Sequence, residues 1–387
     1  METKSSKFDD IAPLYDHEVE QAIQDILVDP GFQHAVGYII PDINWDEFSA
    51  EMSTYKTKEE FQAKMIYPVV RMLGMKVSQS IRGDRWETID RSVEHLFLSN
   101  HRDIVLDAGL LNIMRHEQNF KTTEIAIGDN LLIHPWIDKL VRLNKSFIVR
   151  RGLSIKEKLQ ASKHMSEYIH YVINEKGESV WIAQREGRAK NSDDRTQDSL
   201  LKMLALYPED KPFIDSLKEL NLIPLSISYE YDPTDYLKAK EFQQKRDDPD
   251  FKKTQRDDLL NMEIGILGYK GNVVFRFGDC INAELDKITE PDKRLQPALA
   301  AQIIDQEIHA NYEIYPCNYI AYDLFNKESR FSDKYTKEQV ENFKAYLEKQ
   351  IKKIDLDYID HDFVLDKMLE MYSNTLKNHL VAIASKS

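Results

Sequence analysis

A histidine and an aspartate six positions apart, His101 and Asp107, could act as a base and its orienting acid. They join the alternating apolar run 95–98 to the helix-like stretch 106–118, at a strand-to-helix junction. An imidazole can take a proton from a hydroxyl while a carboxylate fixes its tautomer and stabilises the imidazolium. Asp103 is an alternative orienting acid. We expect Asp107 to be the partner, because Asp103 is only two residues from the histidine and can cap the helix.

Arginines follow two further apolar stretches. Arg150 and Arg151 come after 146–149, and Glu186, Gly187 and Arg188 come after 180–183. Guanidinium groups bind phosphate oxygens with a fork geometry that lysine lacks, and glycine allows a ligand to approach the backbone closely. Because ligands of α/β proteins bind at the carboxyl ends of parallel strands, we expect an anion site near His101. For Arg150 a plain surface position is an equal alternative.

The surrounding elements change in character near residue 90. Residues 1–90 are polar and helical, with an apolar stripe over 61–73 that Pro68 should interrupt. Beyond them, strands are expected at 95–99, 123–127, 146–150, 179–184, 222–229 and 272–277, and helices at 106–118, 130–143, 154–175, 197–206 and 212–220. This alternation predicts an α/β fold with a central mixed, mainly parallel sheet flanked by helices.

The chain is expected to divide into three parts: an N-terminal helical unit (1–90), an α/β domain (91–285) and a helical C-terminal region packed on it (286–387). Within the second part, the charged segment 232–258 should be an excursion from the sheet. In the third, helices are expected at 295–311, 336–353 and 360–384.

Composition and charge restrict the partners and the cellular compartment that we expect for the protein. The net charge of −14 over 387 residues argues against nucleic acid as a partner. Two cysteines, an N-terminus without an apolar signal core and the absence of long apolar runs favour a cytoplasmic protein. A basic cluster over 139–195 nevertheless indicates a small anionic ligand or an anionic carrier. No spacing of metal ligands is apparent, so we expect no metal.

Four segments in order carry a family resemblance: His101 to Asp107, Phe147 to Arg151, Glu186 to Arg188, and the apolar strand 222–227 with Pro224. The series resembles the four blocks of the glycerophospholipid acyltransferase superfamily, over about residues 90–230. The run 126–131, the doubled arginine and the strand 271–278 lean toward its glycerol-3-phosphate acyltransferase branch. One departure stands out: the family has four residues between histidine and aspartate, and here there are five.

The resemblance implies an O-acyltransferase that moves a fatty acyl group from a thioester to a hydroxyl of glycerol 3-phosphate or a related lysophospholipid. His101 would be the general base oriented by Asp107, and Arg150, Arg151 and Arg188 would bind the phosphate of the acceptor. Glu186 would orient Arg188 or bind an acceptor hydroxyl. The acyl donor, coenzyme A or acyl carrier protein, would be a co-substrate, with no other cofactor.

Two alternatives remain from the sequence. The acceptor could be a lipid without phosphate, or the chain could be a catalytically silent lipid-binding protein of the same fold, to which the altered spacing points. The protein could take up acyl chains at the inner membrane face, where the stripe 61–73 or a local basic face would make a peripheral contact with the bilayer. The basic cluster 139–195 could instead receive an acidic carrier protein.

Overall fold

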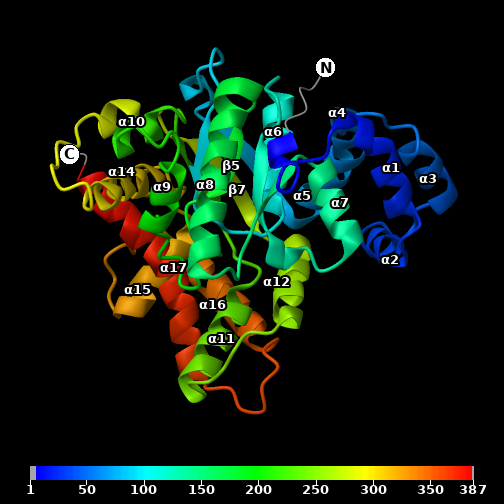
Figure 1. Ribbon diagram of the computed structural model, residues 1–387. Coiled ribbons are helices and arrows are strands. Elements are labelled where there is room, and N and C mark those ends of the chain that lie inside the picture. Colours follow the sequence, from blue (N-terminus) through cyan, green and yellow to red (C-terminus); the bar gives the residue numbers. More distant parts are fainter. Residues whose placement is uncertain (1–5, 386–387) are drawn as a thin grey trace.

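The computed structural model describes residues 6–385. Within them lies one seven-stranded sheet in the order β1-β7-β6-β2-β5-β3-β4 (Figure 1). The strands are β1 (Ser78–Asp84), β2 (Leu96–Ser99), β3 (Glu124–Gly128), β4 (Ser146–Val149), β5 (Val180–Ala183), β6 (Ile223–Tyr229) and β7 (Gly271–Phe277). The antiparallel pairing of β6 with β7 makes β7 and β1 run opposite to the other five strands, which are mutually parallel. The predicted α/β fold with a mixed, mainly parallel sheet is confirmed.

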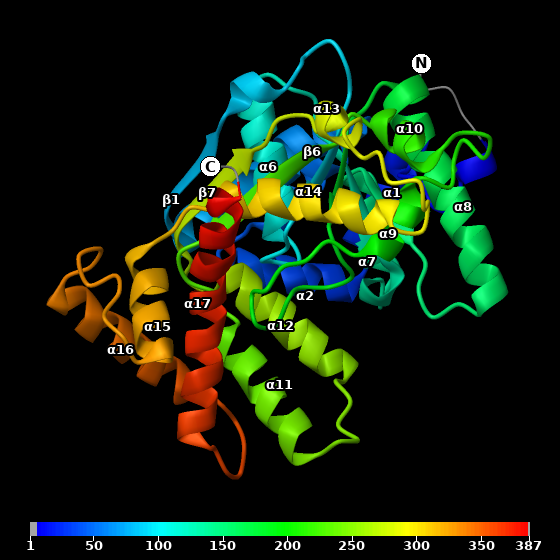
Figure 2. The ribbon, with the colours of Figure 1, turned by 90° about the vertical axis from the view of Figure 1, so that its left-hand side faces the viewer.

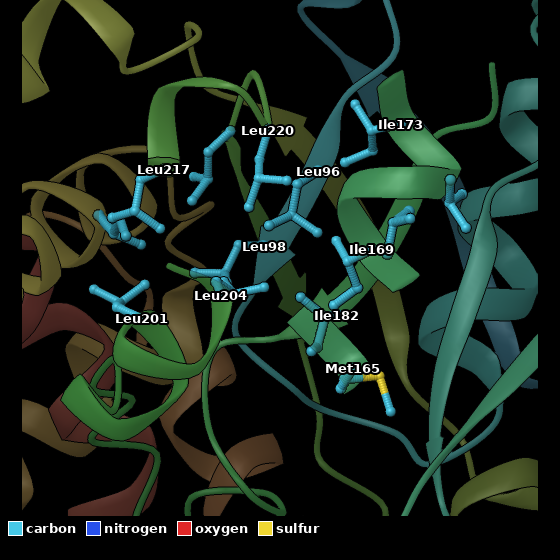
Figure 3. Packing of buried hydrophobic residues seen from close by; sticks show 14 of the residues in the cluster. Leu96, Leu98, Met165, Ile169, Ile173, Ile182, Leu201, Leu204, Leu217 and Leu220 are labelled. Atoms are coloured by element: carbon cyan, nitrogen blue, oxygen red, sulfur yellow. The ribbon is translucent and has the colours of Figure 1, made fainter. Parts of the chain in front are cut away.

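The central strands are apolar on both sides because helices cover both faces of the sheet. Leu96 and Leu98 of β2 face one layer and Phe97 faces the other, as the two-residue period of a strand requires. Figure 3 shows the first layer, in which Leu96, Leu98 and Ile182 pack against neighbouring helices. The helices of that layer are α8 (Ile155–Tyr171), α9 (Asp198–Leu204), α10 (Phe213–Lys218), α13 (Asn282–Leu285) and α14 (Gln296–Ala310). On the opposite face lie α5 (Tyr67–Val77) and α6 (Leu106–Glu117).

The N-terminal helices form a separate apolar cluster beside the sheet (Figure 1). They are α1 (Asp16–Leu27), α2 (Pro30–Ile39), α3 (Trp45–Met52) and α4 (Lys58–Phe61), with α7 (Pro135–Leu143) packed on α1. A π-helical turn over Gln62–Ile66 separates α4 from α5, in which Pro68 is the second residue, so the expected interruption is confirmed. Phe61, Met65, Val70 and Leu73 are buried and Ile66 and Val69 are partly buried, so the stripe 61–73 belongs mainly to the core.

Residues 78–84 correct the expectation that 1–90 is wholly helical, because they form the edge strand β1. The segment Ser78–Asp84 has no alternation of apolar and polar residues, and its side chains are partly exposed. It joins the sheet through parallel pairing with β7, from Ser78 opposite Gly271 to Asp84 opposite Arg276. An edge strand held by backbone hydrogen bonds needs no apolar pattern, so sequence periodicity could not find it.

A second group of helices extends below the sheet in Figures 1 and 2. It contains α11 (Asp235–Asp247), α12 (Gln255–Leu267), α15 (Pro316–Asn326), α16 (Lys337–Ile351) and α17 (His361–Ala384). Residues of α11, α15, α16 and α17 share one apolar cluster. The charged segment 232–258 is therefore an excursion, as expected, but a mostly helical one that leaves the sheet between β6 and β7. Short 3-10 turns at Ser6–Phe8, Trp86–Thr88 and Asp129–Leu131 and a π turn at Val172–Lys176 complete the elements. Among residues 6–385, no helix combines the length and hydropathy needed to cross a bilayer.

Candidate active site

His101 lies just beyond the carboxyl end of the buried central strand β2. Asn100, which precedes it, is itself buried and is bound to the neighbouring strand β6. Its side-chain amide donates to the carbonyl of Ile227 at 2.8 Å and accepts from the amide N–H of the same residue at 2.8 Å. The two bonds have the pattern of the backbone hydrogen bonds between paired strands. They therefore hold in place the backbone from which the side chain of His101 projects.

The imidazole of His101 is hydrogen-bonded to Asp107. Nδ1 lies 2.8 Å from Oδ2 of the carboxylate, which is fully buried. The edge of Trp181 packs against the imidazole, with ring centroids 5.8 Å apart. Nε2 has no hydrogen-bonding partner among residues 6–385, and the side chain lines a cavity. This is the orientation in which a histidine holds one proton on the aspartate side and can accept another from a bound hydroxyl.

Three further donors hold the carboxylate of Asp107 in place. Its Oδ2 accepts from the amides of Arg102 at 2.7 Å and Asp103 at 3.0 Å, and its Oδ1 accepts from the hydroxyl of Tyr229 at 2.9 Å. Burial and the negative charge of Asp107 raise the pKa of Tyr229 well above its usual range, so that hydroxyl stays a donor. Asp107 is the second residue of α6, where the helix dipole favours a negative charge.

Asp103 has a different position. Its Oδ1 accepts from the amides of Val105 at 2.9 Å and Leu106 at 2.8 Å, which caps the start of α6. The extra residue between His101 and Asp107 is taken up in the turn that this side chain closes. The structure therefore places Asp107, and not Asp103, against the imidazole. Its role in a reaction remains a prediction.

The predicted arginines lie around the same cavity, which has a volume of about 1280 Å³. Arg151 is 3.4 Å from Glu186 through Nη1, and its backbone amide donates to Asp129 at 3.1 Å. Arg188 donates to Thr234 at 3.2 Å and to Asn261 at 3.3 Å. Glu186 thus contacts Arg151 rather than Arg188, the arginine that it was expected to orient.

Arg150 and Gly187 also line the cavity, in different ways. The guanidinium of Arg150 is half exposed and bound to Asp10 at 2.8 Å. Gly187 has φ +66°, the left-handed conformation that glycine adopts without strain. It lets the chain turn back between Glu186 and Arg188, so both side chains reach the cavity. Six of the eight predicted site residues therefore line the cavity. Of the other two, Asp107 is bonded to His101, and Asp103 caps the start of α6.

Several residues at this site were not predicted from the sequence. Tyr229 ends the strand next to β2, so its position at a carboxyl strand end was the available signal. Lys190, Lys245 and Lys253 also line the cavity, the last two from the α11–α12 segment. Lys190 is paired with Glu241 at 2.6 Å, and burial lowers its pKa. The apolar part of the lining, called here the apolar wall, is formed by Ile11, Val149, Ala161, Met165, Ile182, Leu200 and Met203. Within residues 6–385, no three His, Cys, Asp or Glu side chains are grouped as a metal site.

A cavity with a histidine–aspartate pair, arginines and an apolar wall invites comparison with known proteins. Residues 81–213 match the Acyltransferase family model. The matched segment runs from β1 to the start of α10 and includes His101, Asp107, Arg151 and Arg188. No curated protein matches the chain. Among solved structures, the chain is similar to the 1-acyl-sn-glycerophosphate (LPA) acyltransferase PlsC from Thermotoga maritima, with 11% identity over 74% of this chain and 94% of that chain and a TM-score of 0.35.

Proposed function

We propose that the protein is an O-acyltransferase that transfers a fatty acyl group from a thioester to a hydroxyl of glycerol 3-phosphate or a related lysophospholipid. The supporting observation is the joint position of three features in one cavity: the free Nε2 of His101, the guanidinium groups of Arg151 and Arg188, and an apolar wall. An acceptor with a phosphate and a hydroxyl and a donor with an acyl chain together match these features.

In this proposal the acceptor hydroxyl gives its proton to Nε2 of His101 as its oxygen attacks the thioester carbonyl. The imidazolium that forms is stabilised by Asp107, whose charge Tyr229 and two backbone amides hold in place. The tetrahedral intermediate then collapses, the carbon–sulfur bond breaks, and the proton on His101 passes to the leaving thiolate. No acyl-enzyme is required.

Arg151 and Arg188 bind the phosphate of the acceptor, with Arg150 as a third and more exposed contact. Glu186 orients Arg151, and Gly187 allows the close turn between them. The acyl chain lies along the apolar wall. The donor is coenzyme A thioester or acyl carrier protein, and the protein works in the cytoplasm or as a peripheral protein at the inner membrane face.

The test is an acceptor screen with one labelled acyl thioester and purified protein. Glycerol 3-phosphate, lysophosphatidate and a lipid without phosphate are compared, and thioester consumption is measured with and without each. His101→Ala should abolish transfer and leave the circular dichroism spectrum unchanged; full activity would overturn the mechanism. Consumption of no thioester with any acceptor would favour the silent lipid-binding alternative.

Two further variants test whether Arg151 and Arg188 bind the phosphate of the acceptor. Arg151→Ala and Arg188→Ala should raise the KM for glycerol 3-phosphate about tenfold or more, because each removes a charge-assisted contact to phosphate. Lys352→Ala, which removes an exposed cation at the end of α16, is the matched control. An unchanged KM in both arginine variants would point to the acceptor without phosphate.

A further inference from the structure

The N-terminal turn of α8 presents two apolar side chains to solvent. Ile155 is 91% exposed and Leu159 is 55% exposed, and four residues apart they share one face of the helix. Figure 2 shows this end of α8 projecting at the lower right, away from the sheet. We call residues 155–159 the α8 tip. Among residues 6–385, no other large apolar side chain is as exposed as that of Ile155, and its burial against a partner would be favourable.

Basic residues surround these apolar side chains. Lys156 and Lys158 of the α8 tip are exposed, and Lys163, about one turn beyond the tip, is paired with Glu209 at 3.1 Å. The one acid of the tip, Glu157, is tied to Ser154 by a capping box: its carboxylate accepts from the Ser154 amide at 2.9 Å. Lysines beside exposed aliphatic side chains are the pattern of a segment that lies in the interface of an anionic bilayer.

The position of the α8 tip relative to the cavity adds a second argument. Lys158, Ala161 and Met165 on a neighbouring face of α8 line the cavity that contains His101. One helix therefore joins the cavity wall to the exposed apolar face. An acyl chain or lipid acceptor that leaves a bilayer at the α8 tip would meet the cavity directly.

We infer that the α8 tip is a docking surface for an anionic lipid bilayer, with Ile155 and Leu159 inserted among the headgroups and Lys156 and Lys158 facing lipid phosphates. The stripe 61–73, the other apolar candidate, is less available, because four of its six apolar residues are buried and Ile66 and Val69 are partly buried. The net charge of −14 does not prevent docking, because charges beyond a Debye length of about 8 Å are screened at physiological salt. An acidic carrier protein is the competing occupant. The exposed aliphatic side chains of Ile155 and Leu159 beside lysines favour the bilayer, because they can insert at the boundary of headgroups and acyl chains while the lysines meet lipid phosphates.

The test measures co-flotation of the full chain with vesicles of phosphatidylcholine, with and without phosphatidylglycerol. Ile155→Gln/Leu159→Gln should lower the partition coefficient about tenfold or more on both kinds of vesicle. Lys156→Gln should lower it about fivefold on the anionic vesicles only. The matched controls, Val28→Gln/Val381→Gln and Lys352→Gln, alter exposed residues on other elements and should bind as the wild type does.

Three outcomes would overturn the inference. They are absence of vesicle binding by the wild type, vesicle binding that survives in the tip variants, and loss of acyl carrier protein association or self-association in those variants while vesicle binding is kept. Vesicle binding is measured without acyl transfer. The docking surface can therefore be refuted while the proposed function holds, and the proposed function can be refuted while the docking surface holds. If both hold, the double variant should transfer normally from a soluble short-chain thioester to glycerol 3-phosphate.

Discussion

Replacing Asp107 with asparagine separates the two roles of this carboxylate. Oδ2 of Asp107 accepts from three N–H groups, those of His101, Arg102 and Asp103, whereas Oδ1 meets only the hydroxyl of Tyr229. Asparagine should therefore turn its carbonyl oxygen toward the three donors and its NH₂ toward Tyr229, whose oxygen can accept. The histidine then keeps its tautomer and loses only the negative charge beside it.

The size of the effect follows from that charge. An imidazolium and a carboxylate with charge centres about 4 Å apart interact by about 4 kcal/mol at an effective dielectric constant of about 20. Asp107→Asn should lower kcat about a thousandfold while KM changes little, since the lost term acts only when His101 carries the second proton. Stability should fall by about 1–3 kcal/mol, because charge-assisted hydrogen bonds become neutral ones.

The assay is steady-state acyl transfer, combined with urea unfolding to confirm a folded variant. Asp103→Asn is the matched control, because asparagine caps a helix as well as aspartate does, and its kcat should stay within a few-fold of wild type. Equal losses in the two variants, or more than a tenth of wild-type kcat in Asp107→Asn, would refute the assignment of Asp107 as the orienting acid.

Two further predictions concern stability. Burial and the nearby charge of Asp232 raise the pKa of Asp235 to about 6, so the unfolding free energy should fall as pH rises from about 4 to about 6. Asp235→Asn, still bonded to Tyr346, Tyr372 and Gln350, should remove up to about 3 kcal/mol of that fall in urea titrations at several pH values. Burial also raises the pKa of Asp305 to about 6, so a similar fall due to Asp305 should persist in the Asp235→Asn variant. The prediction is contradicted if the unfolding free energy of the variant depends on pH as that of the wild type does. Gly187→Ala, at φ +66° with open space around it, should cost about 1–2 kcal/mol of stability and raise the KM of the acceptor by displacing Glu186 and Arg188; a neutral result would show that this loop is not strained.

Sequence periodicity found the strands whose buried residues are apolar, and it missed elements rich in polar or charged residues, such as β1 and α11. Six strands were predicted within one residue of their observed ends, because each carries apolar residues into a covered sheet. The polar strand β1 was missed, since its place depends on pairing with β7. The helix α11 was missed as well. Its charged residues Asp235 and Lys238 are buried and paired, to Tyr346 and to Asp232 respectively, so composition suggested a solvated segment.

The candidate site divides in a similar way. His101, Arg151 and Arg188 could be named from the sequence, because each follows an apolar strand, and parallel strands bring their carboxyl ends to one edge. Tyr229, the ion pair of Arg151 with Glu186, and the lysines of the α11–α12 segment could not be assigned, since their contacts cross between elements more than thirty residues apart.

The sequence alone determined the fold class, the order of the strands along the chain and the types of residue available for chemistry, because local periodicity and strand-end positions are encoded residue by residue. The choice of Asp107 over Asp103 was left to the tertiary structure. It depends on the hydrogen bonds of the turn 100–105 between β2 and α6. The carboxylate of Asp103 accepts from the amides of Val105 and Leu106, whereas β6 places the hydroxyl of Tyr229 against Asp107. The exposure of the α8 tip and the burial of the stripe 61–73 were decided in the same way, because two similar apolar patterns differ only in what packs against them.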